Sequence, residues 1–168
     1  MTELFRRASA GAVALLLGST AICSAGEMSA KSAPRPVMQT VTARFKDAKV
    51  VGVAREKTED QKEVYEVSLV DQGRHIDVIL NPDGSMVLFE REIAFKELPQ
   101  PVAATLGEQY AKARYKLVEE VYKMVEGKEA LAYYEMLLTD SKKQVAAVEI
   151  AADGKILKVE KKKSLNED

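Results

Sequence analysis

The residues best suited to chemistry lie around the only histidine of the chain. His75 stands two positions from Asp77, and strand alternation places Glu66 on the neighbouring strand. Nucleophilic catalysis requires a nucleophile and a base that a third group orients, but the sequence has no Gly-x-Ser-x-Gly or comparable motif. Zinc sites usually draw on several His or Cys ligands. We therefore predict no catalytic residue, no metal site and no cofactor, and we do not expect an enzyme.

A second oxygen-rich segment is "NPDGS", residues 81–85. A calcium loop of the EF-hand type needs Asp or Asn at alternating positions, Gly at the sixth and Glu at the twelfth, and this segment lacks that pattern. Its counterpart "AADGK", residues 151–155, has alanine in place of Asn81. Both segments therefore predict hairpin turns, in which glycine takes a positive φ without a Cβ clash.

The N-terminus has the pattern of a secretory signal peptide. Arg6 and Arg7 precede an apolar run over 10–22, and small residues then lead to a cleavage site after Ala25. The run is shorter than the about 20 apolar residues that span a bilayer, and Ile22 stands where a lipoprotein site needs a small residue. We predict a periplasmic or secreted protein without a transmembrane segment after cleavage.

Composition narrows the possible partners. Cleavage would remove the only cysteine, Cys23, so the mature chain would have neither a disulfide nor a thiol ligand. The formal net charge is −1, with 25 basic and 26 acidic residues. Because nucleic-acid binding needs an excess of basic side chains, we expect no nucleic-acid partner.

The same pattern occurs twice along the chain. Tyr65 in "VYEVSLV" aligns with Tyr134 in "YYEMLLT", and the Asp-Gly corner at Gly84 aligns with that at Gly154. Helical spacing of apolar residues precedes each copy, over 36–45 and 101–110. The three aligned pairs of segments are 36–45 with 101–110, 64–70 with 133–139, and 75–84 with 145–154.

Each copy therefore predicts one helix followed by about four antiparallel strands. Residues 113–127 fit an amphipathic helix as well as a strand, and their counterpart, 48–59, favours the strand. The fold class is then α+β, with two units that form one long sheet and helices on a single face. The predicted divisions are a signal peptide 1–25, a disordered leader 26–35, a first repeat 36–97, a second repeat 98–161 and a flexible tail 162–168.

These motifs resemble the PepSY-like family, also described as β-lactamase-inhibitor-protein-like (BLIP-like). The resemblance rests on the Tyr-Glu-Val strand, the Asp-Gly corner after a Val/Ile strand, and the Leu98-Pro99 pair before the second helix, and it covers about 36–160. It implies a tandem α+β repeat with helices on one side of a curved sheet, in an exported bacterial protein. Inhibition of an extracytoplasmic hydrolase is implied by the inhibitor likeness. The inhibitor itself is disulfide-bonded, whereas the mature chain here would have no cysteine.

The uncovered sheet face is the predicted binding surface, with apolar anchors surrounded by acidic groups. A curled sheet or a dimer that buries the same residues is the alternative. We expect an exported or envelope protein as partner of a non-catalytic binding protein, while a small-ligand or metal-sensing accessory module remains the alternative function. The predicted surface residues are His75, Asp77, Ile79, Phe89, Tyr133, Glu135, Leu137 and Glu149.

Overall fold

A computed structural model describes residues 26–58 and 60–162 of the chain. The predicted signal peptide and positions 163–168 of the predicted tail lie outside the described residues. Among the helices of the described part, none is long and apolar enough to cross a membrane.

The strands of the described residues join one antiparallel sheet of nine, in which every strand pairs with its neighbours in the sequence. The strands are β1 Gly26–Glu27, β2 Lys49–Lys57, β3 Glu63–Asp71, β4 Arg74–Leu80, β5 Met86–Glu92, β6 Arg114–Val125, β7 Lys128–Thr139, β8 Val145–Ile150 and β9 Ile156–Lys162. The α-helices are α1 Arg35–Arg44 and α2 Gln100–Gln109, and the short 3-10 turns are η1 Ala30–Ser32 and η2 Phe95–Glu97.

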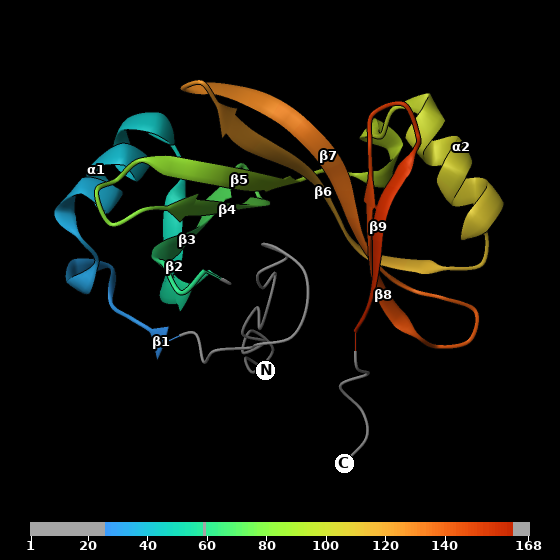
Figure 1. Cartoon of the computed structure of the whole chain (residues 1–168), viewed down its shortest axis with the longest axis horizontal. Coiled ribbons are helices and arrows are strands. Elements are labelled where there is room, and N and C mark those ends of the chain that lie inside the picture. Colours follow the sequence, from blue (N-terminus) through green and yellow to red (C-terminus); the bar gives the residue numbers. More distant parts are fainter. Residues whose placement is uncertain (1–25, 59, 163–168) are drawn as a thin grey trace, which may run out of the picture.

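The order of one helix and four strands occurs twice, as α1 with β2–β5 and α2 with β6–β9. The sheet is strongly bent, and both helices lie on its outer side, one over each half (Figure 1). The α+β class is thus confirmed. The segment that the sequence left open between helix and strand is β6, as the repeat favoured.

Each helix covers its own apolar core. Val37 and Val41 of α1 pack with strands β2–β5, and Val102 and Leu106 of α2 pack with strands of the second half. The aligned tyrosines lie in matching places. Tyr65 belongs to the first core and is opposite Leu80, whereas Tyr134 belongs to the second and is opposite Ile150.

The two Asp-Gly corners hold the two helices in the same way. The hydroxyl of Thr40 in α1 donates to the carbonyl of Gly84 at 2.8 Å, and Thr105 in α2 donates to Gly154 at 2.8 Å. Both glycines have positive φ, 85° and 90°. A Cβ on Gly84 would lie 2.6 Å from the carbonyl oxygen of Pro36, and one on Gly154 would lie 2.7 Å from that of Pro101. Each corner therefore requires glycine for its φ and for the close approach of a helix.

The predicted disordered leader is ordered in part, which corrects the sequence interpretation. Its first two residues form β1, which pairs with β2 through Gly26 opposite Arg55. The backbone N–H of Met28 donates to the carbonyl of Val53 at 2.9 Å. Without this pairing β2 would be an edge strand with unpaired backbone groups, and composition alone does not reveal that a leader can supply them.

Candidate functional site

The sheet face opposite the two helices, called the concave face below, is lined with carboxylates. Strand pairing places Glu119 directly opposite both Glu92 and Glu135, and Glu135 directly opposite Glu149. Asp77 of β4 lies directly opposite Glu90 of β5. We call this set the acidic row; its members are Glu56, Glu66, Asp77, Glu90, Glu92, Glu119, Glu135 and Glu149.

Period-two alternation explains why these residues share a face. Successive side chains of a strand point to opposite faces, and the helix-side neighbours are core residues. Val78 lies in the first core, so Asp77 and Ile79 face away from α1. Met136 lies in the second core, so its neighbour Glu135 faces away from α2. The row therefore follows from the apolar pattern of the helix side.

The row is unusual because its central carboxylates are buried. Only 4% of Glu119 is exposed, and Asp77, Glu90 and Glu135 are buried too. Burial, reinforced by Glu90 and further carboxylates, raises the pKa of Glu119 to about 9. Burial and the nearby carboxylate of Glu135 raise the pKa of Glu90 to about 8. At neutral pH the row therefore holds protons that ordinary carboxylates would have lost.

At the first-half end of the row, Glu66 behaves in the same way. Burial, then the charges of Asp77 and Glu56, raise its pKa to about 8. Burial also raises the pKa of Asp77, although a hydrogen bond from Ser68 opposes that shift. The row thus carries excess protons across both halves of the sheet.

Positive charge approaches the row at its second-half end. Lys158 and Lys123 both lower the pKa of Glu149, against the larger effect of burial, which raises it. The Lys123 ammonium lies 5.2 Å from the centre of the Tyr133 ring. Tyr133 itself is buried, and burial with the charges of Glu149 and Glu135 raises the pKa of its hydroxyl.

Seven of the eight predicted surface residues belong to the concave face, in two groups. His75, Asp77 and Ile79 lie on β4, and the others lie on the paired strands β7 and β8. Ile79 packs with Val64 and Leu88 in a small apolar cluster on this face. The second group consists of Tyr133, Glu135, Leu137 and Glu149.

The prediction for Phe89 is wrong. Phe89 lies directly opposite Val78 and packs in the core under α1. Its ring stacks on Tyr122 with 4.8 Å between centroids. The pairing between β4 and β5 shifts at Ile79 and Leu80, and a shift of one residue moves a side chain to the other face. Leu88 and Glu90 occupy the concave face instead.

Sequence reasoning missed the two carboxylates that join the groups. Glu90 of β5 and Glu119 of β6 lie between β4 and β7 and make the row continuous. Placing Phe89 in the core would have revealed Glu90, because neighbours in a strand face opposite sides. The expected arrangement of exposed apolar anchors surrounded by acidic groups is also incorrect, since Ile79 and Tyr133 are buried. Their burial agrees with the alternative of a curled sheet.

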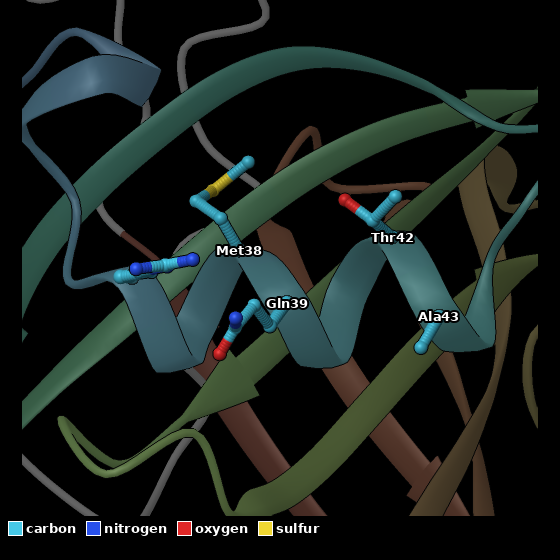
Figure 2. Close-up of a pocket in the computed structure, with 5 residues that line it drawn as sticks. Met38, Gln39, Thr42 and Ala43 are labelled. Atoms are coloured by element: carbon cyan, nitrogen blue, oxygen red, sulfur yellow. The ribbon is translucent and has the colours of Figure 1, made fainter.

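Two hollows elsewhere offer less chemistry. One of about 410 Å³ follows the outer face of α1 (Figure 2) and is lined by Arg35, Met38, Gln39, Thr42 and Ala43. The other, of about 200 Å³, lies between the end of α1 and the sheet, and its arginines, Arg44 and Arg91, are ion-paired with glutamates. Among the described residues, no group of three or more His, Cys, Asp or Glu is arranged to hold a metal ion.

Comparison with known proteins places the fold. A scan against protein-family models finds no match, and a search of curated proteins finds none. Among solved structures, a protein of Bacteroides eggerthii provisionally described as periplasmic is similar with a TM-score of 0.63 at 16% identity, over 77% of this chain and 88% of that chain.

Two further structures agree. A DUF2874 family protein of Bacteroides uniformis has a TM-score of 0.62 at 15% identity, over 77% of this chain and 89% of that chain. A BLIP-like protein of Bacteroides fragilis has a TM-score of 0.58 at 13% identity, over 77% of this chain and 86% of that chain. The chain therefore has the α+β fold of BLIP-like and DUF2874 proteins.

Proposed function

We propose that this chain is an exported, non-catalytic binding protein of the periplasm, whose concave face binds a positively charged segment of another envelope protein. The N-terminal signal pattern supports export, and a protein of similar fold is described as periplasmic. The proposal includes the sequence-derived assignment to the PepSY-like family and an origin of the two halves by duplication, which the matching Thr40 and Thr105 hydrogen bonds support.

The observation that carries the proposal is the direct apposition of carboxylates in the acidic row. Glu119 has a glutamate directly opposite it on both sides, and like charges in that position destabilise a sheet. A bound ammonium or guanidinium would replace the retained protons and favour the charged carboxylates. Lys123 and Lys158, which already lower the pKa of Glu149, illustrate this effect at one end of the row.

This exchange predicts how binding depends on pH. Because Glu90 and Glu119 have pKa values of about 8 and 9, a cationic ligand must displace their protons at neutral pH. Binding should therefore release protons and become tighter as the pH rises from 6 to 9. The proposed inhibition of an extracytoplasmic hydrolase is a narrower form of this function, supported only by the likeness of fold.

A lysine-rich peptide is a suitable probe, with a Gly/Ser peptide of equal length as its control. Calorimetric titration of the exported protein at low ionic strength should show binding of the cationic peptide alone, with proton release in buffers of different ionisation enthalpy. The variant Glu149→Lys should lose at least about tenfold in affinity, equivalent to about 1.4 kcal/mol.

The matched control is Glu108→Lys, which makes a glutamate-to-lysine change at an exposed position of α2. It should bind the peptide like the unaltered protein. Equal loss in both variants would mean that net charge alone drives binding, and the concave face would then have no special role. If the concave-face variant binds the peptide as tightly as the unaltered protein does, the concave face is not the binding site.

A further inference from the structure

The last strand of the sheet leaves one side open to pairing. In the described part of the chain, β9 is the outermost strand and pairs only with β8. Leu157 and Val159 of β9 are 49% and 46% exposed, among the most exposed large apolar residues described. An edge strand presents a row of backbone donors and acceptors to another strand. The opposite edge differs, because β1 covers part of β2.

The sequence of β9 complements itself in the antiparallel direction. When two copies meet about a two-fold axis at Val159, the two Val159 side chains lie opposite each other. Lys158 then lies opposite Glu160 of the second copy, and Glu160 lies opposite Lys158 of the second copy. Within one chain these two side chains are already close, with 3.6 Å between Lys158 Nζ and Glu160 Oε2. Opposite charges in directly facing positions stabilise paired strands.

Neighbouring registers are unfavourable. Moving the axis by one residue places Lys158 opposite Lys158 of the second copy, or Glu160 opposite Glu160 of the second copy. Either arrangement sets like charges face to face. In the register centred on Val159, exposed Lys161 lies opposite Leu157 of the second copy, where its aliphatic stem can cover apolar surface while its charge stays in water.

From this edge and its charge pattern, we propose that the protein forms a two-fold dimer through antiparallel pairing of β9, in the register centred on Val159. The two sheets become one continuous sheet. The occupant of the edge is a second copy, because the strand carries both members of each charge pair. An interface of one strand pair is small, so the dimer should dissociate on dilution. The proposal is independent of the function of the concave face.

Charge exchange tests the register. In sedimentation equilibrium the exported protein should show a concentration-dependent dimer. Lys158→Glu should weaken it about tenfold, because two symmetric pairs become repulsive. Glu160→Lys should have the same effect, and the double variant should dimerise like the unaltered protein. A mixture of the two single variants should form a heterodimer, since each chain then supplies one sign of charge.

A disulfide provides a second, independent readout. With Cys23→Ser to remove the only native thiol, Val159→Cys should crosslink two copies on oxidation, because directly opposed residues have Cα atoms about 4.5–5.5 Å apart, within disulfide range. Leu157→Cys is the matched control and should stay uncrosslinked, since the two cysteines would lie about 13 Å apart. Circular dichroism verifies that each variant is folded.

Either of two results would overturn the proposed dimer, and a third would overturn its register. One is an unaltered protein that stays monomeric at the highest attainable concentration. The other is dimerisation that persists unchanged in the Lys158→Glu variant. Preferential crosslinking at position 157 would refute the register.

Discussion

At the scale of single residues, two glycines explain why the chain contains the Asp-Gly corner twice. Gly84 and Gly154 each contact the first turn of a helix, and a Cβ added to either glycine would clash with a proline carbonyl of that turn. The threonine hydroxyl one turn later donates to the same glycine's carbonyl. Each corner is therefore a turn and also a contact surface for the first turn of a helix, called the helix seat below. The contact with the helix determines how much stability a substitution of the glycine costs.

The helix seat predicts unequal effects of alanine at two turn glycines. Gly84→Ala should lower the free energy of unfolding by about 3 kcal/mol or more, because an unfavourable positive φ adds to a clash with the Pro36 carbonyl. Gly73 has a similar φ of 82° but nothing within 4 Å of its added Cβ. Gly73→Ala should therefore cost only about 1–2 kcal/mol. Urea denaturation measures both, and equal losses would disprove the seat.

At the scale of elements, the β6–β7 hairpin connects the two halves of the molecule. Its far end reaches α1, where Arg44 donates through Nε and Nη2 to both carboxylate oxygens of Glu129, each at 2.7 Å. The Arg44 guanidinium also lies 5.3 Å from the ring centre of Phe45. The β6–β7 hairpin, which belongs to the second half, thus contacts α1 of the first half.

This connection should appear as a coupling energy. In a double-mutant cycle, Arg44→Gln and Glu129→Gln should couple by about 0.5–1 kcal/mol, the modest range expected for a half-exposed bidentate pair. Added salt should reduce the coupling. Lys62 and Asp60, at 4.0 Å and mostly exposed, serve as the matched pair with coupling near zero. A coupling of the hairpin pair no larger than that of the control would contradict the structural link.

The same scale shows what sequence could and could not predict. Alternation around Tyr65 and helical spacing around Leu106 predict the elements correctly, because each depends on local burial of apolar side chains. Phe89 was misplaced because its face depends on the pairing of β4 with β5, which shifts near the turn. Glu90 and Glu119 were missed for the related reason that the acidic row exists only once the seven strands β2–β8 are in register.

At the scale of the whole molecule, the acidic row predicts an unusual pH dependence of stability. Glu66, Glu90 and Glu119 have folded pKa values of about 8, 8 and 9, against 4.5 for an unperturbed glutamate. Between these values the folded chain binds more protons than the unfolded chain. The free energy of unfolding must therefore fall as the pH rises from about 4.5 to 9. The stabilisation from these protonated glutamates is complete below their pKa in the unfolded chain. It is lost as the pH rises through their pKa in the folded chain.

Thermal unfolding between pH 5 and pH 9 measures this effect. The melting temperature should fall across the range, and Glu119→Gln should flatten the profile because the amide resembles the protonated acid. At pH 9 this variant should be more stable than the unaltered protein by on the order of 1–3 kcal/mol. Glu108→Gln, on the exposed side of α2, should leave the profile unchanged. A melting temperature that increases toward pH 9 would contradict the raised pKa values.

The strictly sequential strand order has a consequence for how an exported chain reaches its native state. Every strand of β1–β9 pairs with the strand before or after it in the sequence. The longest loops that these pairings close are the ones that contain α1, between β1 and β2, and α2, between β5 and β6. Pairing between strands that follow one another keeps sequence separation low, which favours fast folding. A chain that crosses a membrane from its N-terminus can thus complete its first helix-covered hairpins while the later strands are still in transit, without waiting for the C-terminus to emerge.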